Sequence, residues 1–156
     1  MEAEIKIDCL DFNDKDKINT IANWYFDEWS TPKEKTFNRL ESQPNDDVLV
    51  QVIATKQNQL LGTAGLANQV NLIKVHERFK FYKPWVALIY TDKLYRRQGI
   101  GKLMLEEIEK HAKKNNLKEI YLYSFTAESL YIKCGWKTID RVSYKEHNTA
   151  IMKKEF

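Results

Sequence analysis

The sequence has few cysteines and no long apolar run. Cys9 and Cys134 are the only two cysteines among 156 residues, and their spacing fits neither a disulfide framework nor a zinc site. We expect both thiols to be reduced and buried. No stretch approaches the roughly 20 apolar residues that span a bilayer, and residues 1–8 carry acids and lysine where a signal peptide needs an apolar run. These absences predict a cytoplasmic protein with no metal site and no membrane segment.

Neither sign of charge dominates the chain. It has 25 basic and 22 acidic residues and a formal net charge of +3, which gives no reason to expect nucleic acid or an anionic membrane as a partner. The lysines at 110, 113, 114 and 118 fall where a helix end favours positive charge and have no aromatic side chains between them, so they predict a solvated face. A chain of 156 residues with 43% hydrophobic content fits one compact domain over residues 1–156.

Hydrophobic periodicity divides the chain into strands and helices. Strands are predicted over 5–10, 48–54, 60–66, 85–90, 119–123, 136–144 and 149–154. Helices are predicted over 18–30, 32–42, 99–116 and 127–133. The second and third strands are separated by a short polar turn and predict an antiparallel hairpin. The segment 68–83 mixes bulky residues with lysines, so the pattern assigns it to neither helix nor strand and is compatible with a mobile loop that faces the substrate.

Two local patterns give sharper predictions. Thr31, Pro32 and Glu34 predict a helix start with a hydroxyl cap, a proline in the first helical position and a glutamate that closes a capping box. The run over 85–90 is continuously apolar, as expected for a strand that is covered on both faces.

A glycine turn joins this apolar strand to the next helix. The first N–H groups of a helix have no internal partners and lie at the positive end of its dipole, so an anion there completes their hydrogen bonding. Gly99 and Gly101 lack the Cβ atoms that would keep a pyrophosphate from the backbone. Three side chains add positive charge around the turn: Arg96, Arg97 and Lys102. The turn therefore predicts a phosphate site.

Two other phosphate motifs do not fit this turn. A Walker A loop needs glycine where the chain has Arg96 and serine or threonine where it has Leu103. A dinucleotide fingerprint needs a third glycine where the chain has Met104. Neither an NTPase nor a dinucleotide-binding protein is predicted.

The run Arg96-Arg97-Gln98-Gly99-Ile100-Gly101 resembles the signature of the GCN5-related N-acetyltransferases (GNAT), which is Arg or Gln, two residues, Gly, one residue, then Gly or Ala. The resemblance covers about residues 84–136, including Pro84-Trp85 before the strand and the segment 127–136, and the order of elements resembles the family over the whole chain. It implies an α+β fold (an α/β three-layer arrangement), with a mixed, mostly antiparallel sheet of about seven strands flanked by about four helices.

The resemblance also implies acetyl-CoA as co-substrate and an amine as acceptor. Backbone groups of Ile89, Tyr90 and Thr91 would pair with the pantetheine arm in a gap between two strands, and the amides between Arg97 and Lys102 would hold the pyrophosphate. Tyr131 falls on a tyrosine that in many relatives lies near the thioester sulfur, and Ser124 stands where many members have asparagine. The implied cofactor-binding residues are Ile89, Tyr90, Thr91, Arg96, Arg97, Gln98, Gly99, Ile100, Gly101, Lys102, Ser124 and Tyr131.

Acetyl transfer from a thioester needs few side chains. The thiolate leaving group has a reference pKa of about 8.5, so a weak acid such as tyrosine, at about 10, can supply its proton. Since the resemblance places Tyr131 near the thioester sulfur, it implies Tyr131 as the general acid. A strand N–H near Ile89 or Tyr90 would stabilise the oxyanion. The amine must also lose a proton, and the spacing does not separate five candidate bases: Glu28, His76, Glu77, Asp92 and Glu128.

The sequence thus predicts an acetyl-CoA-dependent N-acetyltransferase that binds no metal, nucleic acid or membrane. Because members of this family are often dimers, the resemblance also implies that a homodimer can form. Two alternatives stay open. One is a non-catalytic CoA-binding regulatory domain, and the other is a nucleic-acid or phosphate-binding module that uses Arg96 and Arg97.

Overall fold

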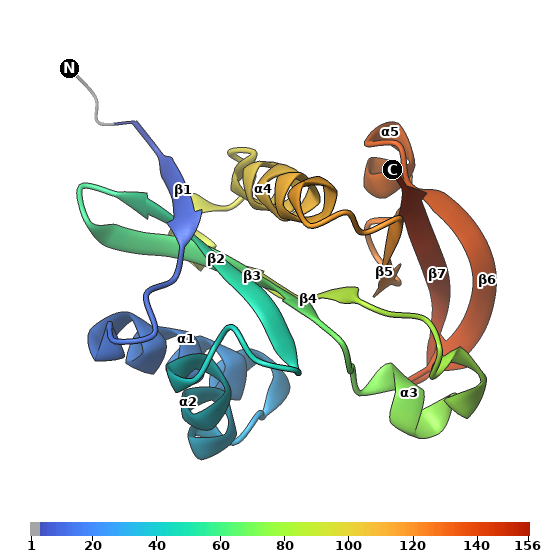
Figure 1. Cartoon of the computed structure of the whole chain (residues 1–156), viewed down its shortest axis with the longest axis horizontal. Helices are drawn as coiled ribbons and strands as arrows, with labels where there is room; N and C mark the ends of the chain where they lie inside the picture. The colour runs from blue at the N-terminus through green and yellow to red at the C-terminus, as the bar shows by residue number, and fades with distance from the viewer. Residues whose placement is uncertain (1–3) are drawn as a thin grey trace.

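A single seven-stranded sheet organises the chain in the computed structural model, which describes residues 4–156 (Figure 1). The strands are β1 (Lys6–Cys9), β2 (Val48–Lys56), β3 (Gln59–Ala67), β4 (Trp85–Thr91), β5 (Glu119–Ser124), β6 (Lys137–Tyr144) and β7 (His147–Glu155). The α-helices are α1 (Lys15–Trp29), α2 (Lys33–Glu41), α3 (Leu72–Val75), α4 (Ile100–Lys114) and α5 (Glu128–Lys133). Two short 3-10 helices are η1 (Glu77–Phe79) and η2 (Lys93–Tyr95).

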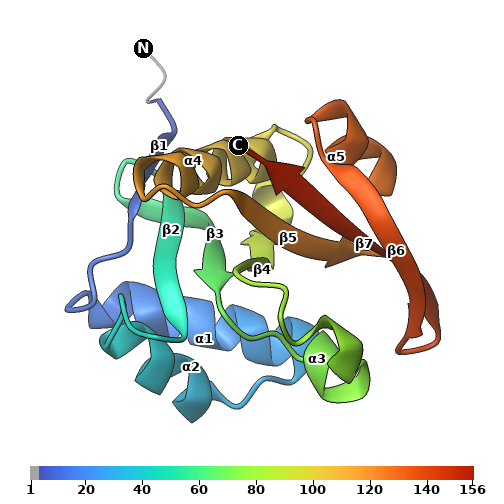
Figure 2. The same cartoon turned by 45° about the vertical axis from the view of Figure 1, so that its right-hand side comes forward.

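The strands lie in the order β1-β2-β3-β4-β5-β7-β6, and only the pair β4–β5 is parallel. Helices α1 and α2 cover one face of the sheet, whereas α4 and α5 lie on the other (Figures 1 and 2). The α+β class and the mixed, mostly antiparallel sheet of seven strands are therefore confirmed. Residues 4–156 form five α-helices, one more than the four predicted, because α3 lies within 68–83, where the sequence pattern assigned no element.

The predicted hairpin is β2–β3, and its turn explains why it forms. Gln57 and Asn58 connect the two strands and have φ angles of 52° and 65°. Two consecutive residues at positive φ are typical of a type I′ turn, whose twist matches that of the strands. The hairpin lies inside the sheet, with β1 paired to β2 on one side and β4 paired to β3 on the other.

The predicted capping box at the start of α2 is wrong. Pro32 is the N-cap residue of α2, and no side chain caps this helix. Ser30 lies in the left-handed region with φ 57°, and the N–H of Thr31 donates to the carbonyl of Tyr25 at 3.3 Å, which ends α1. Only three residues separate α1 from α2. Thr31 therefore takes part in the hydrogen bonds that end α1 and is not the N-cap of α2.

The structure bears on two sequence predictions, one about the burial of the cysteines and one about membrane-spanning helices. The prediction that both cysteines are buried is wrong, because Cys9 is exposed and Cys134 is partly exposed. Cys9 lies on the edge strand β1, where its thiol is 3.3 Å from Nε2 of His111 at the surface. Within residues 4–156, no helix has both the length and the apolar composition needed to cross a bilayer.

Candidate functional site

Strand β4 loses its neighbour on one side soon after it begins. β4 and β5 share a single paired position, Trp85 opposite Tyr121. Beyond it, Ala87, Leu88 and Ile89 are only half-buried. The prediction that this strand is covered on both faces is therefore wrong in its middle, because the two parallel strands separate there. The far half of β4 presents an unpaired edge, which is able to accept an extended ligand as an additional strand.

A β-bulge at Leu88 shapes the same part of β4. Thr63 pairs with Tyr90 and Gly65 with Ala87, so two residues of β4 lie opposite one residue of β3. Leu88 has a φ of 55°, a conformation that costs a residue with a side chain on the order of 1 kcal/mol. The hydroxyl of Tyr25, on α1, donates to the Leu88 carbonyl at 2.8 Å and stabilises the bulge.

The backbone of β4 beyond the bulge has a defined orientation. The N–H of Asp92 donates to the Leu61 carbonyl of β3 at 2.8 Å, and the Thr91 carbonyl accepts from Nε of Arg96 at 2.9 Å. Peptide groups alternate in direction along a regular strand, so the N–H of Tyr90 points to the same side as that of Asp92, toward β3, whereas Ile89 belongs to the bulge. Of the two N–H groups expected near the oxyanion, the geometry thus favours Ile89 over Tyr90.

The glycine turn presents free backbone amides at the start of α4. Arg97 and Gly99 both lie in the left-handed region, with φ angles of 66° and 81°. Gly99 is the N-cap and cannot cap the helix with a side chain, and the first α-helical hydrogen bond runs from Leu103 N–H to the Gly99 carbonyl. The N–H groups of Ile100, Gly101 and Lys102 therefore precede the hydrogen-bonded part of α4. Such a cluster of amides at a helix start binds anions.

Open space lies in front of both glycines of this turn. A Cβ atom built on Gly99 or Gly101 would meet no protein atom within 4 Å. Only Gly99 needs glycine for its backbone conformation, because no positive φ occurs at Gly101. The lack of a side chain at Gly101 thus leaves room for an approaching group rather than relieving strain.

The three cations expected around the turn differ in their surroundings. Arg96 extends back over β4, where its guanidinium lies 5.2 Å from the centroid of the Tyr90 ring and binds the Thr91 carbonyl. Arg97 and Lys102 are exposed, like the neighbouring Gln98. The structure therefore uses Arg96 to hold the end of β4 and leaves Arg97 exposed at the turn, whereas Nζ of Lys102 lies 4.0 Å from the Glu106 carboxylate one turn further along α4.

Helix α5 is anchored at its start by two polar clusters. The Ser124 hydroxyl accepts from the N–H of Ala127 at 3.0 Å, just before the helix. The Glu128 carboxylate accepts from the Thr138 hydroxyl at 2.6 Å and from the Arg141 guanidinium at 2.7 Å, both on β6. These contacts lower the pKa of Glu128, first through the hydrogen bond from Arg141 and then through that from Thr138. Ser124 and Glu128 are thus committed to positioning the helix.

Tyr131 is the residue that this anchoring holds in place. Its ring lies edge-on to Trp136, with centroids 6.3 Å apart, and packs against the main core cluster. Burial raises the pKa of Tyr131, with a smaller contribution from Cys134, so its hydroxyl is protonated at neutral pH. Among residues 4–156 no group hydrogen-bonds to this hydroxyl, which leaves it available to a ligand.

One face of the sheet carries three parts of the expected site: the glycine turn, the unpaired edge of β4, and helix α5. Ile89 of β4, Ile100 of α4 and Tyr131 of α5 all belong to or pack against the same hydrophobic cluster. Figure 2 shows α5 on the side of the sheet that carries the first turn of α4. The sites expected for the pantetheine arm, the pyrophosphate and the thioester are therefore gathered around one cluster.

The five candidate bases lie in different places. Glu128 is engaged by β6, and Nε2 of His76 lies 2.7 Å from the Ser143 carbonyl, on the same strand. Glu77 belongs to η1, whose Phe79 packs in one cluster with Trp85 at the start of β4, opposite the end that carries Thr91. Burial raises the pKa of Tyr90, and the carboxylates of Glu28 and Asp92 raise it further against the effect of Arg96. Of the five candidates, Glu28 and Asp92 are therefore the two whose charge acts on Tyr90 near the end of β4.

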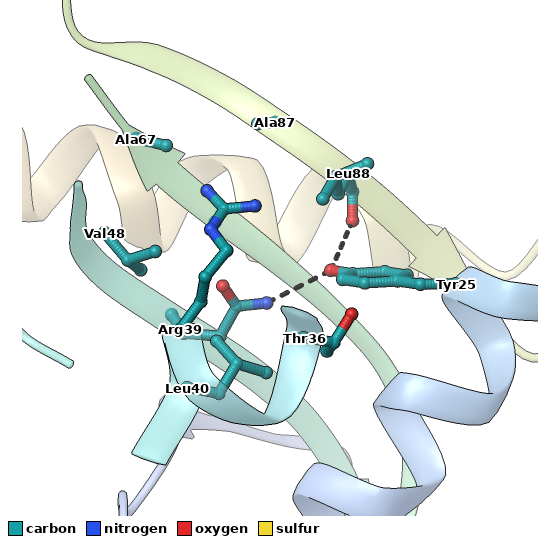
Figure 3. Close-up of a pocket in the computed structure, with 10 residues that line it drawn as sticks. Tyr25, Thr36, Arg39, Leu40, Val48, Ala67, Ala87 and Leu88 are labelled. Carbon is teal, nitrogen blue, oxygen red and sulfur yellow. Dashed lines mark hydrogen bonds between the residues drawn. The ribbon is translucent and has the colours of Figure 1, made fainter. Parts of the chain in front are cut away.

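A pocket on the opposite face of the sheet was not predicted from the sequence (Figure 3). It lies between α1 and α2 on one side and β2, β3 and β4 on the other. Its lining residues are Tyr25, Thr36, Arg39, Leu40, Val48, Gln51, Gly65, Ala67, Ala87 and Leu88. One signal was present in the sequence, because Gln51 is a polar residue within the apolar run of β2 and is only 3% exposed. Arg39 gave no such signal, since an arginine on a helix is usually exposed.

The end of α5 depends on a buried ion pair, and this gives a prediction for stability. Nζ of Lys154 donates to the Cys134 carbonyl at 2.8 Å and forms an ion pair with Glu109, which is 7% exposed. Lys154→Met should lower the free energy of unfolding by about 2 kcal/mol, because it leaves the Glu109 carboxylate without its partner. Urea unfolding would measure this change. The double variant with Glu109→Leu should recover most of the loss, and a single variant as stable as the wild type would contradict the prediction.

Comparisons with known proteins agree with this arrangement. The PaiA N-acetyltransferase from Thermoplasma acidophilum, solved in complex with coenzyme A, has 25% identity and a TM-score of 0.67, with 98% of this chain and 99% of that chain covered. A GNAT acetyltransferase from Streptococcus pneumoniae has 20% identity and a TM-score of 0.71 over 98% and 99% of the two chains. The aminoglycoside 6′-N-acetyltransferase from Enterococcus faecium has 15% identity and a TM-score of 0.71 over 96% of each chain.

The sequence comparisons identify the family. Comparison with curated protein sequences finds no significant match. The model of the acetyltransferase (GNAT) family matches residues 16–136, which extend from α1 through the glycine turn to the end of α5. The chain therefore belongs to the GNAT family of acetyltransferases and is an acyltransferase.

Proposed function

We propose that the chain, as a single domain over residues 1–156, transfers an acetyl group from acetyl-CoA directly to an amine. One observation carries this proposal: free amides at the start of α4 lie on the same face as the unpaired edge of β4 and the hydroxyl of Tyr131. The coenzyme A complex of the Thermoplasma protein, which is similar to this chain over nearly its whole length, supports the same co-substrate.

The proposed binding mode follows from backbone geometry. The amides between Arg97 and Lys102 hold the pyrophosphate, because anions complete the hydrogen bonding of a helix start. The peptide group of Thr91 faces the unpaired edge of β4, where the pantetheine arm adds as a short strand that begins beside Ile89. In this mode Arg96 shapes the end of β4, and its guanidinium is not needed at the phosphates.

The proposed reaction is a direct attack of the amine on the thioester carbonyl. The N–H of Ile89 donates to the oxygen of the tetrahedral intermediate, where negative charge develops. When the carbon–sulfur bond breaks, the thiolate takes a proton from the hydroxyl of Tyr131. The amine must itself lose a proton, and we propose Glu28 or Asp92 as the base, since both carboxylates contribute to the raised pKa of Tyr90 near this end of β4.

Acetyl transfer is tested by following free thiol while the protein is mixed with acetyl-CoA and a panel of amines. We expect thiol to appear only when an accepted amine is present, together with the N-acetylated product by mass spectrometry. Tight binding of coenzyme A without thiol release for any amine would instead favour the non-catalytic CoA-binding domain. The wild-type protein without amine serves as the control for hydrolysis of the thioester.

A further inference from the structure

The pocket of Figure 3 lies directly behind the bulge of β4. Leu88 lines this pocket and packs against the cluster formed with α1 and α2. The next residue, Ile89, packs against the cluster on the α4 face, where the thioester is expected. Two consecutive residues thus face opposite sides of the sheet, and β4 alone separates the pocket from the proposed thioester site. Since β5 has separated from β4 at this level, a group held in the pocket is able to reach the thioester past the unpaired edge.

The pocket contains one cation, and among the described residues that line it none is acidic. Nε of Arg39 donates to Oδ2 of Asp47 at 2.9 Å, and Asp47 lies outside the lining. This ion pair uses one nitrogen of the guanidinium. Figure 3 shows Arg39 extending from α2 toward β3 and β4, so that the guanidinium stands between Val48 and Leu88. An arginine oriented by one carboxylate in this way is well suited to bind a second one through its terminal nitrogens.

The remaining lining combines small residues with two polar side chains. Ala67 and Ala87 carry only methyl groups on the side of β3 and β4, and Gly65 makes room for the side chain of Gln51, whose Oε1 would lie 2.6 Å from a Cβ atom at that position. Gln51 is 3% exposed and directs its amide N–H groups to the hydroxyls of Tyr25 and Thr63, at 3.2 and 2.7 Å. With its amide nitrogen committed in this way, Gln51 is able to offer its carbonyl oxygen to a donor group. A ligand that carries both an anionic acceptor and an N–H donor therefore matches the pocket.

From these observations we infer that the pocket binds a carboxylate of the acceptor, so that the favoured substrates are amines of the amino-acid type. The inference rests on the proposed acetyl transfer. Arg39 holds the carboxylate and Gln51 orients the adjacent polar group. The amine to be acetylated then projects past Leu88 toward the thioester on the far side of β4.

A matched panel of acceptors tests this inference. The panel contains the common amino acids, the corresponding amino-acid amides, and linear diamines, and kcat/KM is measured for each at saturating acetyl-CoA. Removing the carboxylate while keeping the amine should lower kcat/KM by roughly tenfold or more, since hydrogen bonds to a charged group are the strong ones. Amides or diamines that are acetylated equally well or better would overturn the inference and leave acetyl transfer intact.

Two variants distinguish the binding of the acceptor carboxylate by Arg39 from the ion pair between Arg39 and Asp47. Arg39→Met should raise KM for the amino acid about tenfold and leave both KM for acetyl-CoA and the rate with the amide unchanged. Asp47→Asn breaks the same ion pair but keeps the cation, so it should retain the preference for the carboxylate. Equal losses in both variants with all acceptors would mean that Arg39 only holds α2 against the sheet, and the inference would fall. If coenzyme A binds but no amine is acetylated, the proposed acetyl transfer fails as well.

Discussion

Replacing Gly101 with aspartate should abolish the binding of coenzyme A while leaving the free protein at least as stable as the wild type. A side chain at this position meets no protein atom within 4 Å and requires no positive φ. An acidic residue in the first turn of α4 also interacts favourably with the helix dipole, and loss of glycine removes its entropic disadvantage. The same carboxylate would occupy the space of the pyrophosphate and repel it. We expect the dissociation constant to increase roughly hundredfold or more, as several charge-assisted hydrogen bonds are lost together.

Two further variants serve as controls for this result. Gly101→Asn has nearly the same size without the charge, so its effect on affinity should be smaller than that of aspartate. Gly99→Ala places a side chain at a φ of 81° and should lower the free energy of unfolding by about 1 kcal/mol. Calorimetric titration and thermal unfolding report the two quantities separately. An aspartate variant with wild-type affinity would show that the phosphates do not lie over this turn.

Replacing Tyr131 with phenylalanine should lower kcat by roughly a hundredfold and change the affinity for coenzyme A little. General acid catalysis by one side chain typically contributes at least this factor. The fold should tolerate the change, because within residues 4–156 nothing hydrogen-bonds to the hydroxyl and the ring keeps its contact with Trp136. Steady-state kinetics and a binding titration measure the two effects. A loss of affinity equal to the loss in kcat would refute the role of Tyr131 as an acid.

The raised pKa of Tyr131 also predicts how kcat depends on pH. Burial disfavours the tyrosinate, so the group remains protonated beyond its ordinary pKa of about 10. Deprotonation of Tyr131 should therefore cause no decline in kcat between neutral pH and that value. A decline that disappears in the phenylalanine variant would indicate that the hydroxyl ionises earlier.

The parts of the site that depend on local sequence were predictable. The glycine turn, the helix that follows it and the short helix with Tyr131 were all expected from apolar periodicity, glycine positions and helix dipole charge. Each of these signals acts within a few residues of the chain. The hairpin β2–β3 was predictable for the same reason, since the polar residues of its turn separate two apolar runs.

The parts that depend on distant partners were not predictable. The bulge at Leu88 has no local signal, because leucine seldom adopts a positive φ and is held there by the hydroxyl of Tyr25 on another element. The partial exposure of β4 follows from its separation from β5, which no pattern within β4 indicates. The pocket joins α2 to three strands, so the pairing of Arg39 with Asp47 and the burial of Gln51 emerge only in the folded chain.

The most direct test of the account is a calorimetric titration of the wild-type protein with coenzyme A and, in parallel, with pantetheine. Pantetheine keeps the thiol arm but lacks the diphosphate and the nucleotide attached to it, so the comparison measures what this half of the molecule adds to binding. The Gly101→Asp variant then isolates the part that depends on the amides between Arg97 and Lys102. We predict clear binding of coenzyme A and roughly hundredfold weaker binding of pantetheine. No heat of binding with coenzyme A, or equal affinity for both molecules, would contradict the account.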